Sequence, residues 1–249
     1  MRILSKKRNT ETPKVPSFAS FLQSRKANDQ PKTELDILTS GTGTIVSPQG
    51  HLLTSSHVVP RGSRAMALFC GKTFETKVVA RLHEEDALLL RIEGTTKQKF
   101  PYSQIVASDY QLGKPVFFVG YPMPDSLGIH PRFTKTYINS SEGYFDDKTR
   151  FTVVADAANG SSGSAVFNRS GEVIGFVSAS VFAAGRFADE FPKDLCFCVK
   201  SETFLDKFSK HLPPQKTAKT QKRDRQEIIN AAAETSVLIS AFSNTRRGK

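Results

Sequence analysis

Tryptophan is absent from this 249-residue sequence, and cysteine occurs only three times, at Cys70, Cys196 and Cys198. The odd number argues against a disulfide framework, and the spacing does not match that of a metal site. We therefore expect three buried or half-buried thiols in a reducing compartment, with no bound metal and no cofactor.

Long apolar runs are also missing. No stretch reaches the ~18 residues that a membrane-spanning helix needs. Residues 1–8 are basic but have no apolar stretch behind them, so no secretory signal is predicted. These absences favour an intracellular protein without a membrane span. Cytoplasm is the expected compartment, and an organelle or the nucleus stays open.

Acidic residues are outnumbered, with 24 Asp and Glu against 35 Lys and Arg, which gives a net charge of +11. The excess lies at the ends, because residues 1–36 carry +4 and residues 210–249 carry +6. Residues 1–36 also show no hydrophobic period, so we predict a disordered basic tail. The basic ends are either solvated tails or weak contacts for polyanions.

Between these ends, short apolar or alternating runs follow one another, separated by glycine, proline, Asn and Asp. A hairpin is predicted where residues 43–47 meet a Pro-Gln-Gly turn and then residues 51–54. Strands at intervals of roughly 8–15 residues without helical patterns predict an all-β barrel or sandwich. The further expected strands are 66–70, 73–82, 87–92, 116–120, 137–140, 151–154, 165–168, 173–178 and 195–200.

Two short C-terminal helices complete the predicted architecture. Phe204, Leu205 and Phe208 share a helical face in residues 201–211, and Pro213 and Pro214 end that helix. Residues 225–242 form the second expected helix, after a basic linker. This helix would either pack back on the barrels or form an oligomer or partner contact.

Three residues that are far apart in the chain could form a nucleophilic site. Ser162 stands beside glycines, His57 follows small residues, and Asp86 opens an apolar strand. A serine hydroxyl is almost fully protonated near neutral pH, so it needs an imidazole to take its proton. The imidazole in turn needs a third group to fix its tautomer. Separations of 29 and 76 residues mean that only the tertiary fold can bring the three together.

The flanks of these residues resemble trypsin-like serine peptidases, and most closely the HtrA/Deg branch. The matching blocks are Gly-Thr-Gly-Thr-Ile-Val with Leu-Thr-Ser-Ser-His-Val-Val around His57, Asp-Ala-Leu-Leu-Leu at 86–90, Val-Gly-Tyr-Pro at 119–122, and Asn-Gly-Ser-Ser-Gly-Ser at 159–164. The resemblance covers residues 37–208. It implies two six-stranded antiparallel Greek-key β-barrels, at 37–112 and 113–208. The basic linker and C-terminal helix predicted from the local pattern follow at 209–249.

The resemblance also implies a role for each site residue. Ser162 would attack the peptide carbonyl, His57 would take its proton, and Asp86 would hold the imidazole. The backbone N–H groups of Gly160 and Ser162 would form the oxyanion hole, in which one donor contributes roughly 3–4 kcal/mol. The chain departs from the branch in a shorter segment before Ser162. Residues 209–249 are also too few for a PDZ domain.

Some alternatives stay open at this level. Glu85 competes with Asp86 as the group that orients His57, and Ser161 and Ser164 compete with Ser162 as the nucleophile. Asp156 either selects basic substrate side chains or is a structural residue before the loop, so the substrate preference is open.

The sequence thus predicts an intracellular trypsin-like serine endopeptidase that acts on protein or peptide substrates through an acyl-enzyme. The alternative is a catalytically silent or latent barrel protein that binds partners or serves as a scaffold through its basic tails.

Overall fold

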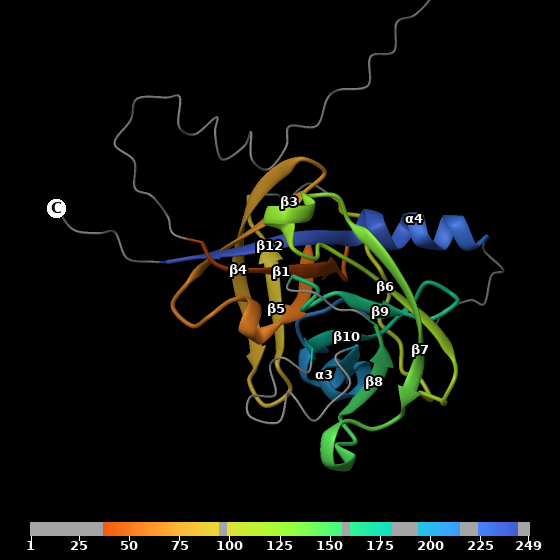
Figure 1. The fold of residues 1–249 in the computed structure, drawn as a ribbon. Helices are drawn as coiled ribbons and strands as arrows, with labels where there is room; N and C mark the ends of the chain where they lie inside the picture. Colours follow the sequence, from red (N-terminus) through yellow and green to blue (C-terminus); the bar gives the residue numbers. More distant parts are fainter. Residues whose placement is uncertain (1–36, 95–98, 156–159, 181–193, 215–223, 244–249) are drawn as a thin grey trace, which may run out of the picture.

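The computed structural model describes residues 37–94, 99–155, 160–180, 194–214 and 224–243. These residues form two closed antiparallel barrels of six strands each, with a few short helices (Figure 1). The predicted all-β fold of two six-stranded barrels is therefore confirmed. The predicted disordered tail, residues 1–36, lies outside the described residues.

The first barrel carries the residues around His57 and Asp86. In order around the barrel its strands are β1 (Ile37–Ile45), β12 (Ser236–Phe242), β3 (Arg64–Phe69), β4 (Lys72–Leu82), β5 (Ala87–Ile92) and β2 (His51–Ser55). The 3-10 turn η1 (Ser56–Val58) follows β2 directly and contains His57.

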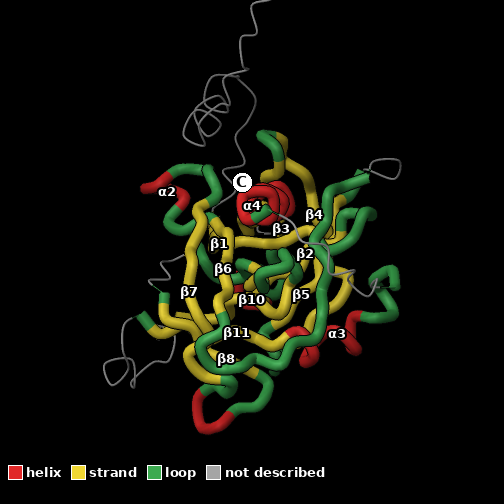
Figure 2. Tube along the Cα trace, turned by 90° about the vertical axis from the view of Figure 1, so that its right-hand side faces the viewer, coloured by secondary structure: helices red, strands yellow, loops and turns green. Residues whose placement is uncertain are grey.

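The second barrel carries the loop with Ser162. Its strands, again in order around the barrel, are β10 (Val173–Ser180), β11 (Leu195–Lys200), β8 (Arg150–Val154), β7 (Arg132–Ser140), β6 (Pro115–Gly120) and β9 (Ala165–Phe167). The helices beside the barrels are α2 (Pro124–Leu127), η2 (Tyr144–Asp146), α3 (Ser201–Phe208) and α4 (Arg225–Thr235). Figure 2 views α4 end-on.

Strand β5 explains how the two barrels are joined next to the site. Leu88 and Leu90 belong to the apolar core of the first barrel. Ala87 and Leu89, which point to the other face of the strand, belong to a second cluster together with Phe117 and other residues of the second barrel. Because both faces of β5 are buried over residues 87–90, this part of the strand is a continuous apolar run without alternation. The same packing fixes Asp86, the residue before β5, at the junction of the barrels.

The predicted helix at 225–242 is correct only in its first part. Helix α4 begins at Arg225, where the Asp224 side chain accepts a hydrogen bond from Gln226 N at 2.9 Å, and it ends at Thr235. Residues 236–242 instead form strand β12, which runs on from α4 across the first barrel (Figure 1). Val237 and Ile239 alternate into the core of that barrel, so the period here is two and not 3.6.

Strand β12 closes the first barrel, because it pairs antiparallel with β1 on one side and with β3 on the other. Five strands of this barrel therefore come from residues 37–92 and the sixth from the C-terminal segment. The prediction of only a linker and a helix at 209–249 was therefore incomplete, because this segment also supplies a strand of the first barrel. In α4, Ile228 and Ala232 are buried in the cluster that joins the barrels, so the apolar face of the helix packs back on the body.

Two smaller expectations have different outcomes. Cys196 and Cys198 are buried thiols as expected, whereas Cys70 is exposed, because it lies in the tight turn between β3 and β4. Helix α3 lies where the first helix was predicted, and its Phe204 and Phe208 are fully buried. None of the helices in the described ranges is long and apolar enough to cross a membrane.

Candidate active site

His57 stands in the η1 turn at the end of β2, with half of its side chain exposed (50%). The turn is fixed from two sides. Ser56 N donates to the Asp86 carbonyl at 2.8 Å, and Arg81 Nη1 donates to the Ser56 carbonyl at 2.8 Å and to its hydroxyl at 2.9 Å. The imidazole is therefore accessible while its backbone is held in place.

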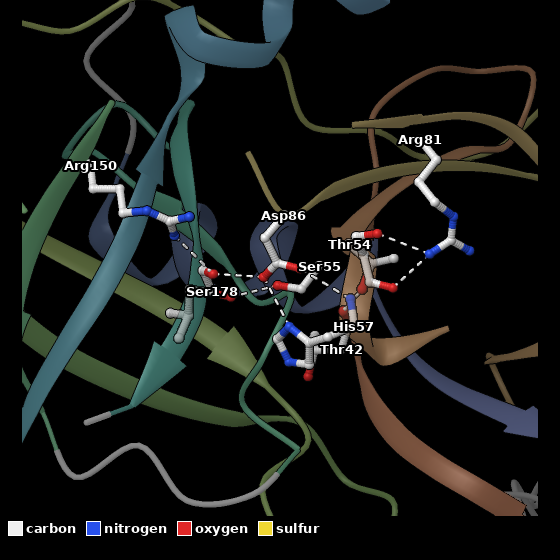
Figure 3. Close-up of polar contacts among 10 residues, drawn as sticks. Thr42, Thr54, Ser55, His57, Arg81, Asp86, Arg150 and Ser178 are labelled. Atoms are coloured by element: carbon white, nitrogen blue, oxygen red, sulfur yellow. Dashed lines mark hydrogen bonds and ion pairs between the residues drawn. The ribbon is translucent and has the colours of Figure 1, made fainter. Parts of the chain in front are cut away.

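Asp86 lies in the tight turn before β5, with a left-handed φ of 55°. Its carboxylate accepts three hydrogen bonds, from His57 N at 3.0 Å, from His57 Nδ1 at 2.9 Å and from Ser178 Oγ at 2.6 Å. Figure 3 shows Asp86 between His57 and Ser178. Because an ionised carboxylate can only accept, the Nδ1 of His57 carries the proton and Nε2 is free to act as a base.

The electrostatics of Asp86 agree with this assignment. Burial alone would raise the pKa of the Asp86 carboxyl, but the hydrogen bonds and charge of His57, together with the Ser178 hydroxyl, hold that pKa below its usual value. The carboxylate thus stays ionised and keeps the imidazole oriented.

Ser162 lies on the loop before β9, next to the first barrel. Its carbonyl accepts a hydrogen bond from Thr42 N at 2.8 Å, and the following Gly163 N donates to the Val177 carbonyl at 2.7 Å. Gly41 separates this loop from the η1 turn, since a Cβ at Gly41 would meet both Val58 and the Ser162 carbonyl, at 2.6 and 3.0 Å. Among the described residues, no hydrogen bond joins Ser162 Oγ to His57 Nε2.

Burial separates Ser162 from the two competing serines. Ser161 is 4% exposed and Ser164 is fully buried, whereas Ser162 is only half-buried. A nucleophile must be reached by its substrate, so the exposure favours Ser162. Glu85 is likewise occupied elsewhere, because its carboxylate forms an ion pair with Lys207 of α3. His57 has Asp86, and not Glu85, as its carboxylate partner.

Gly160 lies at the other end of this loop, in a backbone conformation that favours glycine (φ 95°). Its carbonyl accepts a hydrogen bond from Thr42 Oγ1 at 2.8 Å, and the same hydroxyl accepts from Tyr121 N at 2.9 Å. A Cβ at Gly160 would lie 2.4 Å from the Tyr121 carbonyl. Thr42 therefore ties the loop to both barrels. Asp156, the other residue considered for substrate preference, lies outside the described residues.

Sequence reasoning missed three residues that shape the site, namely Thr42, Ser178 and Arg150. Thr42 is flanked by glycines in the first block, which is a usable signal for a close backbone approach. Ser178 and Arg150 carry no local signal, because Ser178 contacts Asp86 across the barrels and Arg150 contacts Ser178. No group of three or more His, Cys, Asp and Glu side chains that could hold a metal ion occurs in the described part of the chain.

Gly163 provides a test of how tightly the loop is packed. A Cβ there would lie 2.0 Å from the Thr42 carbonyl, and φ is 85°. We expect Gly163→Ala to lower the free energy of unfolding by about 2–4 kcal/mol, from backbone strain and the clash together. Urea denaturation measures this change. Gly62→Ala is the matched control, because Gly62 has a similar φ of 78° but nothing within 4 Å of the added Cβ. Equal losses in both variants would contradict the close packing.

Comparison with known proteins identifies the class to which this fold and site belong. The family model described as "Trypsin-like peptidase domain" matches residues 41–176, which is more than half of the chain. The chain therefore belongs to the trypsin-like peptidase domain family, and the resemblance seen in its sequence blocks is confirmed.

Individual relatives place the chain near the HtrA/Deg branch. It is 24% identical over 228 residues to the serine endoprotease DegS of Haemophilus influenzae, which covers 89% of this chain and 63% of DegS. An uncharacterized protein of Sinorhizobium fredii, y4bJ, is 28% identical over 206 residues, which is 81% of this chain and 32% of that protein. The chain thus spans less than two thirds of either relative.

A solved structure shares the fold. The crystal structure of an inactive form of Rv3671c from Mycobacterium tuberculosis, which carries a serine-to-alanine substitution, superposes with a TM-score of 0.54 at 21% identity. The match covers 71% of this chain and 83% of that one, and it supports the double-barrel fold alone.

Proposed function

We propose that this chain is a serine endopeptidase that cleaves protein or peptide substrates through an acyl-enzyme on Ser162. The observation that carries the proposal is the hydrogen bond between His57 Nδ1 and the ionised Asp86, at 2.9 Å, beside the loop that bears Ser162. This pair leaves Nε2 as the unprotonated nitrogen of the His57 ring, whose side chain is half exposed. Membership of the trypsin-like peptidase family supports the same reaction.

In the proposed reaction, Ser162 Oγ attacks the carbonyl carbon of the scissile bond and its proton passes to His57 Nε2. The tetrahedral intermediate collapses when His57 gives that proton to the leaving amine, which breaks the C–N bond. Water then attacks the acyl-enzyme with His57 again as the base. The N–H groups of Gly160 and Ser162 are proposed to stabilise the negative oxygen in both halves of the reaction.

An active-site label tests the proposal. A fluorophosphonate should modify the native protein on Ser162, as mapped by mass spectrometry of the labelled peptide, and should not modify Ser162→Ala. Ser170→Ala, which removes an exposed turn serine, should label like the wild type. Equal labelling of the wild type and Ser162→Ala, or no labelling of the native protein under any condition, would overturn the assignment.

A latent peptidase is the second candidate, because no Ser162–His57 hydrogen bond exists among the described residues. In that form the loop bearing Ser162 would complete the site only when a substrate or partner is bound. A labelling rate constant that rises with protein concentration or with added peptide would favour it over a site that is complete at rest.

The cellular location also belongs to the proposal. Cys70, Cys196 and Cys198, all in the described ranges, form no disulfide, which supports an intracellular protein, since disulfides are rare in reducing compartments. Contact of the basic ends with polyanions stays a prediction, because most of those residues lie outside the described ranges.

A further inference from the structure

A chain of directed hydrogen bonds leads from the second barrel to the candidate catalytic histidine. Arg150, the first residue of β8, donates from Nη1 to Ser178 Oγ at 3.1 Å, and Ser178 Oγ donates to Asp86 Oδ2 at 2.6 Å. Asp86 in turn accepts from His57 Nδ1 at 2.9 Å. Figure 3 shows Arg150 pointing toward Ser178 from the side opposite Asp86.

The chemistry of these groups allows the Ser178 hydroxyl to donate its hydrogen bond in only one direction, toward Asp86. A guanidinium has no acceptor and an ionised carboxylate has no donor, so the single proton of the Ser178 hydroxyl must point to Asp86. Arg150 occupies the acceptor side of that hydroxyl and prevents it from rotating to another partner. Since Ser178 is 3% exposed, no bulk water takes the place of Arg150 in this arrangement.

Arg150 is itself held in place and is not a loose surface side chain. Its Nε donates to Asp147 Oδ2 at 3.2 Å, and its side chain is 22% exposed. Asp147 Oδ1 accepts from both Thr149 N and Thr149 Oγ1, at 2.9 and 2.6 Å. A Cβ at Gly143 would lie 2.7 Å from Arg150 Cβ, so the glycine there makes room for the arginine.

The charged side chains of the neighbouring elements form their hydrogen bonds and ion pairs with other groups, although the charge of Arg81 also acts on Asp86. Arg81 of β4 binds Ser56, Arg61 donates to His83 at 2.7 Å, and Glu85 is paired with Lys207 of α3. Arg150 is therefore the charged side chain, in the described part of the chain, that reaches the Asp86 carboxylate through one intervening hydroxyl.

We propose that Arg150 is a positioning residue for the site, which acts through Ser178 to hold the Asp86 carboxylate against His57. It does not touch the reacting atoms. Its role in turnover rests on the proposed peptidase function, but its effect on His57 can be measured without turnover.

Removing the guanidinium frees the Ser178 hydroxyl to rotate away from Asp86. The Asp86 carboxylate then loses the donor that holds it from the second barrel, so its hydrogen bond with His57 Nδ1 should weaken in Arg150→Gln. We expect kcat to fall roughly tenfold from misplacement, with KM changed by less than about twofold.

The experiment is NMR spectroscopy of the His57 ring in Ser162→Ala protein, which needs no activity. Arg150→Gln should weaken the downfield Nδ1–H resonance, whereas Arg150→Lys, which keeps a charged donor, should lie near the wild type. Arg64→Gln is the matched control, because Arg64 forms an exposed ion pair with Glu75 on the first barrel. If Arg150→Gln does not fold, Asp147→Asn, which keeps Arg150 but loosens it, should change this resonance in the same direction.

Several results would overturn the inference. An unchanged Nδ1–H resonance of His57 in a folded Arg150→Gln or Asp147→Asn variant would do so, as would a raised KM with unchanged kcat, which would make Arg150 a substrate contact. A further loss from Arg150→Gln in protein that already carries Ser178→Ala would also count against action through Ser178. Absence of fluorophosphonate labelling would remove the proposed function but would leave the NMR result standing, so the two failures are distinguishable.

Discussion

Asp86→Asn should lower kcat by about four orders of magnitude while leaving the fold intact, the size of effect that a wrong histidine tautomer has in a serine-peptidase triad. The carboxylate of Asp86 accepts three hydrogen bonds, from two nitrogen atoms of His57 and from Ser178 Oγ. An asparagine amide supplies only one oxygen, so its NH₂ group must face at least one of these donors.

The tautomer explains why so small a change has so large an effect. If the NH₂ group faces Nδ1, the imidazole must keep its proton on Nε2 in order to accept at Nδ1. His57 Nε2 can then no longer take the proton of Ser162, and the nucleophile stays a neutral alcohol. Substrate binding does not depend on this proton, so KM should change little.

The measurement is steady-state hydrolysis of an unfolded protein or a peptide substrate, together with circular dichroism to confirm the fold. Asp109→Asn is the matched control, because Asp109 is an exposed carboxylate paired with Lys114. A loss of only about tenfold in Asp86→Asn, or an equal loss in both variants, would mean that another group orients His57.

The sequence was most informative where function restricts local residue types. His57, Asp86 and Ser162 could be named from their flanks, and the structure brings His57 and Asp86 into direct contact. The order of the blocks also predicted two barrels correctly. The support for Asp86 could not be predicted, because Ser178 lies 92 positions away and belongs to the other barrel.

The C-terminal segment shows a different limit. Ile228 and Ala232 fit a helical face and do lie in α4, but the predicted helix continues to residue 242 and so includes Val237 and Ile239, which alternate as in a strand. The position of β12 between β1 and β3 depends on pairings such as Gly41 with Ile239 and Ala67 with Ile239. Such pairings are set by the closure of the barrel and leave only a period of two in the local sequence.

Removing residues 225–249 should therefore unfold the first barrel. Val237, Leu238 and Ile239 are almost completely buried, and each contributes about 1.5–3 kcal/mol by burial. The summed contribution of these three side chains is comparable to or larger than half of the free energy of unfolding of a typical domain, which is roughly 5–15 kcal/mol. The deletion also exposes the unpaired edges of β1 and β3, which favours aggregation.

A chain that ends at residue 224 should thus be insoluble or lack a cooperative urea transition. The control is a chain that ends at residue 243, which should unfold like the full sequence. Activity should vanish with the fold, because β1 carries Thr42, whose N–H and hydroxyl bind the carbonyls of Ser162 and Gly160.

A separate peptide of residues 225–243, added during refolding of the shortened chain, should restore the transition and the labelling of Ser162, since β12 forms its barrel contacts through strand pairing and side-chain burial. A shortened chain that keeps the urea midpoint of the full sequence would show that the barrel closes without this strand.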